Sequence, residues 1–242
     1  MATDTAADAD EQRARRLVTA SSTIQYRLGL TDYLGHTSMR VPGADRYLIK
    51  PKHSPSVRAM DSLGPDDLIV VDGNGVSATG GRPPAEVFIH TEILKRRPDV
   101  NVVVHTHQPL AVTMGILEAP IHPLLHVQSP LVADPVPIWP CSLLVTDQEL
   151  GTQLADALGD GPVAHLQGHG IVSVGATIEE ATVNAIHLEQ LAKVNLEVLK
   201  TGLAPRVIPP EQIERLREQL APVDGRWAYY ASITDVDDAL LV

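Results

Sequence analysis

The sequence predicts a three-layer α/β/α fold around a central sheet that is mainly antiparallel or mixed. Runs rich in β-branched residues alternate with helical patterns, and a tight-turn signal joins two of these runs in the way that connects antiparallel strands. The length of 242 residues suits one such core. We therefore expect residues 11–242 to form a single domain. Residues 1–10, which are small and acidic without periodicity, should form a disordered tail.

The predicted strands are short and bounded by turn signals. They lie at residues 47–49, 67–71, 76–79, 100–107 and 165–174. The second is followed by Asp72-Gly73-Asn74-Gly75, which predicts a hairpin with the third. The fourth, VNVVVHTH, is typical of a buried central strand. The last is a strand or a hairpin, since its glycines allow a bulge or a close backbone approach.

The predicted helices follow from apolar spacing and from proline positions. They lie at residues 11–30, 85–97, 109–115, 147–158 and 177–199. Pro83 and Pro84 suit the start of the second helix, and Pro98 stops it. The last helix has apolar residues on two faces, which indicates burial on both sides and a subunit contact. The proline-rich segment 119–140 should be a loop with short strands.

Composition disfavours several functional classes. The chain has 19 Lys plus Arg against 30 Asp plus Glu, so its formal charge is −11. This charge disfavours nucleic acid and anionic membrane surfaces as partners. Cys141 is the only cysteine, so neither an intramolecular disulfide nor a cysteine-rich zinc motif can form. We find no secretory signal or bilayer-spanning run, and therefore expect a cytoplasmic protein that acts on a small molecule.

Three histidines form a candidate metal site. His105 and His107 are two residues apart on a predicted strand, so their side chains emerge on the same face. His169 is the best third candidate, because Gly168 and Gly170 on either side would leave room for an ion and a substrate. Three imidazoles leave coordination positions open, as in catalytic metal sites. Taken singly, each histidine is more often an ordinary core or surface residue.

Glu86 is the candidate acid–base residue. It falls in the first turn of a predicted helix and shares a face with Ile89 and Ile93, which should point toward the interior. A carboxylate at this position could simply complement the positive helix N-terminus. It could equally serve as a general acid or base, or as an extra metal ligand.

Together these motifs resemble the class II aldolase and adducin family. The Pro-Pro-Ala-Glu motif ending at Glu86, the His-Thr-His motif at 105–107 and the Gly-His-Gly motif at 168–170 occur in the family's order, and the resemblance covers nearly the whole chain. It implies a class II aldolase-like fold, with the three histidines binding a divalent ion and Glu86 working beside it in proton transfer. It also favours an enzyme, because adducin-like members generally lack the full metal set.

The sequence departs from the sugar-phosphate enzymes of that family at two places. Those enzymes usually have Gly-Asn-x-Ser where this chain has the Gly-His-Thr-Ser segment at 35–38. They also carry a serine pair that helps hold the phosphate, where this chain has Pro84 and Ala85, whose side chains donate no hydrogen bond. The chain instead resembles the decarboxylase branch, which acts on hydroxylated aromatic dicarboxylates such as dihydroxyphthalates and hydroxypyridine dicarboxylates.

Several residues are candidates for substrate binding. We expect His36, Ser38 and Arg40 to hold the acid, because a guanidinium grips a carboxylate bidentately and an imidazole adds a donor. Alternatively, Arg40 forms a surface ion pair and His36 is a turn residue. His126 and Tyr229 are candidates to reach a neighbouring subunit's site, although a tyrosine near the C-terminus could also simply pack. Weaker candidates are Arg82, His90, His122 and Tyr230.

These assignments predict a metal-dependent carbon–carbon lyase, namely a decarboxylase in aromatic catabolism. One divalent ion per subunit, zinc or manganese with iron or cobalt also compatible, would act as the electron sink. Glu86 or a nearby tyrosine could then return a proton to the ring carbon. The alternatives are a class II aldolase or epimerase acting on a sugar or sugar phosphate, and a non-catalytic adducin-like binding protein. We expect a homo-oligomer, with a tetramer favoured and with sites near the subunit interfaces.

Overall fold

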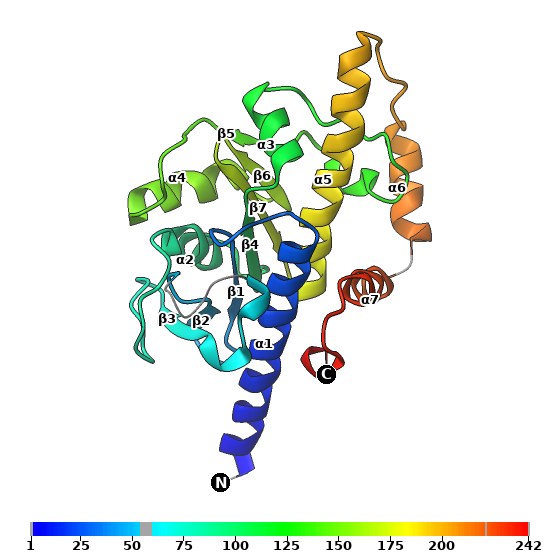
Figure 1. The fold of residues 1–242 in the computed structure, drawn as a ribbon. Helices are drawn as coiled ribbons and strands as arrows, with labels where there is room; N and C mark the ends of the chain where they lie inside the picture. Colours follow the sequence, from blue (N-terminus) through cyan, green and yellow to red (C-terminus); the bar gives the residue numbers. More distant parts are fainter. Residues whose placement is uncertain (1, 54–59, 221, 242) are drawn as a thin grey trace.

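A seven-stranded sheet lies at the centre of the molecule (Figure 1). The structure, a computed structural model, describes residues 2–53, 60–220 and 222–241, and the strands are counted among these. The strands are β1 (His36–Arg40), β2 (Arg46–Ile49), β3 (Ile69–Asp72), β4 (Val102–Thr106), β5 (Ile138–Trp139), β6 (Val163–Leu166) and β7 (Gly170–Gly175). They follow the order β3-β2-β1-β4-β7-β6-β5, and only β5 and β6 run parallel. This confirms the predicted mainly antiparallel or mixed sheet.

Helices cover both faces of the sheet, as the predicted three-layer fold requires (Figure 1). They are α1 (Ala2–Arg27), α2 (Val87–Arg96), α3 (Pro109–Ile116), α4 (Gln148–Leu158), α5 (Ile178–Thr201), α6 (Pro210–Gln219) and α7 (Asp224–Ile233), with short 3-10 turns η1 (Met60–Ser62), η2 (Pro65–Asp67), η3 (Ser129–Val132) and η4 (Asp238–Leu240). The helices α2 and α4 pack with Val103 of β4, whereas α1, α3 and α5 pack with Val102 and Val104. Alternation along β4 therefore supplies two separate hydrophobic cores. None of the helices in the described segments combines the length and apolar character needed to cross a membrane.

The structure differs from the sequence prediction at both ends of the chain and at β1. Helix α1 begins at Ala2, where a disordered tail over residues 1–10 was expected. The reason lies in residues 2–10, which contain four alanines, the strongest helix formers, and three aspartates, which suit the first turns of a helix. Neither β1 nor the helices α6 and α7 was predicted from the sequence. The strand β1 is polar, and α6 and α7 are short helices with few buried residues.

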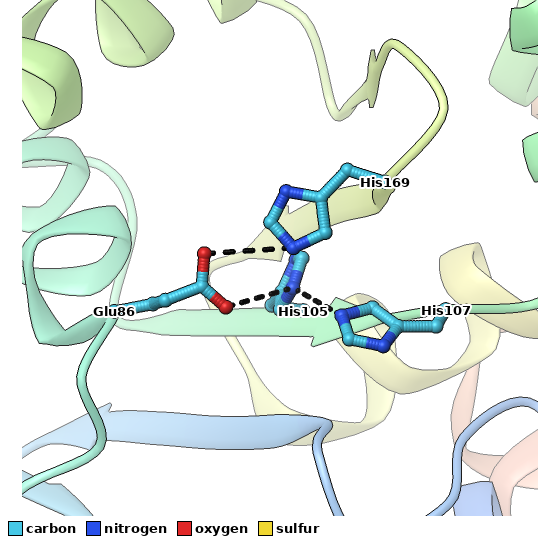
Figure 2. Close-up of side chains that lie close together, drawn as sticks. All are labelled: Glu86, His105, His107 and His169. Atoms are coloured by element: carbon cyan, nitrogen blue, oxygen red, sulfur yellow. Dashed lines mark hydrogen bonds and ion pairs between the residues drawn. The ribbon is translucent and has the colours of Figure 1, made fainter. Parts of the chain in front are cut away.

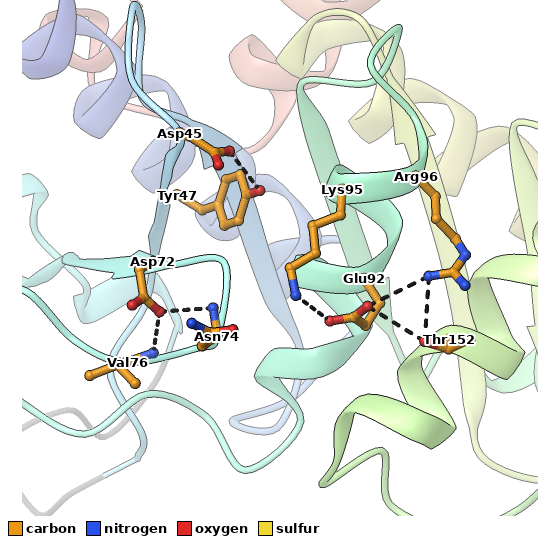
Figure 3. A network of polar contacts seen from close by, with 9 residues as sticks. All are labelled: Asp45, Tyr47, Asp72, Asn74, Val76, Glu92, Lys95, Arg96 and Thr152. Atoms are coloured by element: carbon orange, nitrogen blue, oxygen red, sulfur yellow. Dashed lines mark hydrogen bonds and ion pairs between the residues drawn. The ribbon is translucent and has the colours of Figure 1, made fainter.

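The predicted turn after β3 is present, but the second leg of its hairpin is shorter than expected. Asp72 Oδ1 accepts hydrogen bonds from the backbone N–H groups of Asn74 at 2.8 Å and of Val76 at 2.9 Å (Figure 3). Beyond it, pairing with β3 is reduced to an isolated bridge between Val71 and Ser77. Gly80 and Gly81, at φ +82° and +81°, then turn the chain out of the sheet.

A close contact between α2 and α4 fixes the helix that follows Glu86. Glu92, a buried carboxylate on α2, lies 2.7 Å from Lys95 Nζ and 3.5 Å from Thr152 Oγ1 of α4 (Figure 3). The helices approach so closely that a Cβ atom added at Gly151 would lie 2.5 Å from the carbonyl oxygen of Phe88. Because α2 is held against both the sheet and α4, the start of this helix has a fixed position beside the end of β4.

Candidate metal centre

Four residues from three parts of the fold converge at one end of β4 (Figure 2). His105 lies on β4, and His107 lies just beyond the end of this strand. His169 lies in the turn between β6 and β7, and Glu86 immediately precedes α2 rather than lying inside its first turn. The pairing of Thr106 on β4 with Ile171 on β7 brings that turn beside the histidine pair.

The ligand atoms of these residues lie within one coordination sphere of each other. All four lie within 4.8 Å of one another. The Nε2 atoms of His105 and His107 are 2.9 Å apart, and the Nε2 atom of His169 is 3.5 Å from Glu86 Oε1. Ligands bound at about 2.1 Å to one ion lie roughly 3–4 Å from each other. The spacing of the cluster is therefore that of residues that could hold a metal ion.

Hydrogen bonding around the cluster also fits a divalent ion. His105 Nδ1 lies 2.9 Å from the carbonyl oxygen of Ile171, so Nδ1 must donate and the lone pair of Nε2 faces the cluster. Both ring nitrogens of His169 are buried and have no hydrogen-bond partner among the described residues. Buried polar atoms without partners are rare in native proteins, and a bound ion would satisfy the Nε2 atom of His169.

Burial keeps the cluster in the protonation states that metal ligands need. Burial, reinforced by the neighbouring imidazoles, lowers the pKa of His105 well below its usual value, and it also lowers the pKa of His107. Both rings are therefore neutral near pH 7. Burial by itself would raise the pKa of Glu86. His169 and the Val145 N–H, which donates to Oε1 at 3.0 Å, outweigh burial, so the pKa of this carboxyl is lowered.

Gly170 provides space for the two imidazoles of β4. A Cβ atom at this position would lie 2.9 Å from His107 Cδ2 and 3.0 Å from His105 Cε1. Gly168, on the other side of His169, has φ +64°, in the left-handed region that glycine adopts without strain. Both glycines therefore have a structural reason to flank His169. The expectation that they leave room for an ion and a substrate stays a prediction.

A buried chain of hydrogen bonds lies behind His105. His36 on β1 pairs in register with His105 on β4, and their ring centroids are 5.0 Å apart. His36 Nδ1 lies 2.7 Å from His90 Nε2, and His90 Nδ1 lies 2.7 Å from Ser38 Oγ. Burial lowers the pKa of His90 to about 3, so this ring is neutral. The hydroxyl of Ser38, predicted to bind substrate, is thus occupied by His90 and fully buried.

A cavity of about 280 Å³ opens beside the cluster. Its lining residues are Tyr33, Leu34, His36, Lys50, Lys52, His53, Pro84, Ala85, Glu86 and Leu144. Glu86 and His36 connect it to the histidine cluster, whereas two larger cavities of about 420 Å³ contain none of the four cluster residues. Lys50 and Lys52 were not among the predicted site residues, although the Lys-Pro-Lys-His run directly after a predicted strand is conspicuous in so acidic a chain.

Arg40, the expected carboxylate-binding residue, lies away from this cavity. It is four residues beyond His36 on β1, and at about 3.3 Å per residue the two are roughly 13 Å apart along the strand. Its guanidinium donates to the carbonyl oxygens of Leu94 at 2.8 Å and of Val100 at 3.3 Å, and lies 5.5 Å from the centre of the Tyr47 ring. These contacts join the end of α2 to the sheet. They give Arg40 a structural role in place of the expected role in binding a substrate carboxylate.

His126 and Tyr229 are both exposed and do not line the cavity within this chain. Tyr229 packs against Tyr230, whose hydroxyl accepts a hydrogen bond from Gln190 Nε2 at 3.0 Å. The contribution of His126 and Tyr229 to a neighbouring subunit's site stays a prediction.

Comparison with known proteins identifies the family to which this chain is similar. Residues 15–196 match the model of the Class II Aldolase and Adducin N-terminal domain. A 3,4-dihydroxyphthalate decarboxylase of Arthrobacter keyseri is 30% identical over 88% of this chain and 95% of its own length. An L-fuculose phosphate aldolase of Escherichia coli O6:H1 is also 30% identical, over 80% of this chain and 87% of its own.

Solved structures agree on the fold. An aldolase II superfamily protein from Pseudomonas syringae superposes with a TM-score of 0.81 at 23% identity over 93% of each chain. An L-fuculose 1-phosphate aldolase from Glaciozyma antarctica gives a TM-score of 0.80 at 22% identity, covering 95% of this chain and 91% of its own. The two curated relatives named above are lyases, one a decarboxylase and the other an aldolase, which supports a lyase here. The chain belongs to the class II aldolase and adducin family.

Proposed function

We propose that this protein is a metal-dependent decarboxylase of a hydroxylated aromatic dicarboxylate such as 3,4-dihydroxyphthalate, acting in aromatic catabolism. The cavity wall carries this proposal. Pro84 and Ala85 line it where the sugar-phosphate enzymes of the family carry a serine pair, and Tyr33, Leu34 and Leu144 add a flat or apolar surface suited to an aromatic ring. The similarity to 3,4-dihydroxyphthalate decarboxylases supports the same choice.

The metal would be held by His105, His107 and His169, with Glu86 beside it. When bound, a divalent ion supplies Lewis-acid stabilisation of the negative charge that develops on a chelating substrate oxygen. Zinc and manganese are the leading choices, and iron or cobalt would also suit three imidazoles.

Glu86 is placed to carry the proton. Its Oε1 atom is held by the Val145 N–H at 3.0 Å, and its Oε2 atom lies 4.0 Å from His105 Nε2. As a carboxylate it accepts the proton of the substrate hydroxyl. The bond between the ring and the departing carboxylate then breaks, its electron pair stays with the ring, CO2 leaves, and Glu86 returns the proton to the ring carbon.

The test is an assay of CO2 release by metal-loaded protein. The panel contains 3,4-dihydroxyphthalate, other ortho-hydroxylated aromatic di-acids and hydroxypyridine dicarboxylates, run beside L-fuculose 1-phosphate. We expect CO2 and, from the first compound, a dihydroxybenzoate. If no di-acid releases CO2 while the sugar phosphate is cleaved efficiently, the proposal fails.

An aldolase or epimerase acting on a sugar phosphate is the second candidate. Lys50 and Lys52 on the cavity wall would attract a phosphate as well as a carboxylate, and fuculose phosphate aldolases match this chain at similar identity. Both reactions stabilise negative charge next to a broken C–C bond, so the same four residues would serve either. The substrate panel separates them, and a chain inactive on every compound and without metal would favour an adducin-like binding role.

We also propose a homotetramer. Leu199 and Leu203, at the C-terminal end of α5 and just beyond it, are 51% and 74% exposed and offer an apolar contact between subunits. Light scattering at micromolar concentration tests this, and a monomeric mass with full activity would refute it.

A further inference from the structure

Lys50 is a buried amine without an anionic partner among the described residues. It follows β2 and is only 4% exposed. Its Nζ atom donates to the carbonyl oxygen of Tyr33 at 2.5 Å and contacts Met60 Sδ at 3.3 Å. An ammonium has three N–H donors, so one remains for a ligand in the cavity that Lys50 lines.

The surroundings of Lys50 favour the arrival of an anion. Burial lowers its pKa to about 8, although the more distant Asp32 acts in the opposite direction. A buried ammonium that lacks a paired carboxylate is costly, and a ligand that brings a negative charge would offset this cost. Lys52 and His53 line the same cavity but are exposed, so water and salt weaken their attraction for an anion.

We propose that Lys50 Nζ binds the carboxylate that the substrate retains, and thereby selects aromatic di-acids over mono-acids. This inference rests on the proposed decarboxylase function. One end of the substrate meets the histidine cluster and Glu86, and the retained carboxylate meets Lys50 on the wall of the same cavity. The bond to the Tyr33 carbonyl holds the amine in place, so its remaining donor is oriented before the substrate arrives.

The first test compares 3,4-dihydroxyphthalate with 2,3-dihydroxybenzoate. The two acids share a carboxylate next to a hydroxyl, and the second acid lacks only the other carboxylate. We expect Lys50→Met to lower kcat/KM for the di-acid by about 10- to 100-fold, mainly through KM, and to leave any activity on the mono-acid within about twofold. Lys193→Met, on an exposed lysine of α5, is the matched control and should change neither. An equal loss on both acids, or no loss on either, overturns the inference.

The second test measures binding without turnover. Metal-loaded wild type, Lys50→Met and Lys50→Arg are titrated calorimetrically with phthalate and with benzoate, which carry no hydroxyl group. We expect wild type to prefer phthalate, Lys50→Met to lose that preference and Lys50→Arg to retain part of it. If phthalate binding depends on Lys50 but no acid releases CO2, the decarboxylase proposal fails and the role of Lys50 stands. Wild type that binds phthalate no more tightly than benzoate overturns the role of Lys50, even if the variants do not fold.

Discussion

The histidine cluster adjoins the basic wall of the cavity, formed by Lys50, Lys52 and His53. The two regions are supported in different ways. The cluster is held by regular elements: β4 carries His105, the β6–β7 turn carries His169, and Glu86 precedes a helix packed on both sides. The wall around Lys50 lies beyond the end of β2, where the chain leaves the sheet. In the proposed function, the residues of the scaffold therefore carry the reaction, and Lys50, just outside the sheet, selects the acid. Changes in the cluster should abolish every reaction, and changes in the wall should alter which acid is used.

The largest expected effect is that of removing a proposed metal ligand. His169→Ala should lower activity on any substrate on the order of a thousand-fold or more, because several kcal/mol of charge stabilisation would be lost. The fold should survive, since the ring nitrogens of His169 make no hydrogen bond within the described part of the chain. Elemental analysis should find about one divalent ion per chain in wild type and in an exposed His126→Ala control. Full occupancy in His169→Ala would contradict the ligand assignment.

Glu86→Gln should separate proton transfer from metal binding. The amide oxygen of glutamine can still accept the Val145 N–H, so the local structure should be preserved. We expect kcat to fall by about 100- to 10,000-fold, because the amide cannot carry the proton, while metal content stays near that of wild type. Loss of the metal in this variant would show that Glu86 serves as a ligand instead.

The histidine pair was predictable because its spacing rule is local, whereas Glu86 and His169 were joined to it by the order of the family's motifs. Two histidines two residues apart on a strand share a face, and Gly170 beside His169 leaves room for their rings. Arg40 shows the limit of this reasoning. The same alternation puts Arg40 and His36 on one face of β1, but it does not show that the strand extends away from the site and that Arg40 reaches α2.

The burial of Lys50 could not be predicted from the sequence, for another reason. A lysine after a strand is normally solvated, and its enclosure here depends on Met60 and on the Tyr33 carbonyl, which are brought together only by the folded chain. The failure to predict β1 has the same origin. The strand HTSMR is polar, and its central place in the sheet follows from pairing with β2 and β4 rather than from its own residues.

Lys50→Met should stabilise the substrate-free protein at pH 7 by on the order of 1–3 kcal/mol. The pKa of Lys50 is lowered from 10.5 in the unfolded chain to about 8 in the fold. Below pH 8 both states are protonated and the cost of the buried charge is present in full. Between pH 8 and 10.5 the unfolded state binds more protons, so wild-type stability should rise relative to the variant. Thermal unfolding across this pH range measures the difference, and a destabilised Lys50→Met at pH 7 would indicate a structural role instead.

Arg40→Ala should have the smallest effect on catalysis and a clear effect on stability. The variant loses the hydrogen bonds to the carbonyl oxygens of Leu94 and Val100 and the contact with Tyr47, which should cost about 1–2 kcal/mol in the free energy of unfolding. Because Arg40 lies roughly 13 Å along β1 from His36, KM for the di-acid should change by less than about twofold. Arg40→Lys keeps the charge but not the forked donor, and should recover only part of the stability.

Denaturant unfolding and steady-state kinetics on the same preparations separate the two effects. A large rise in KM for the di-acid, with stability unchanged, would return Arg40 to the substrate site and remove the contrast between the two ends of β1.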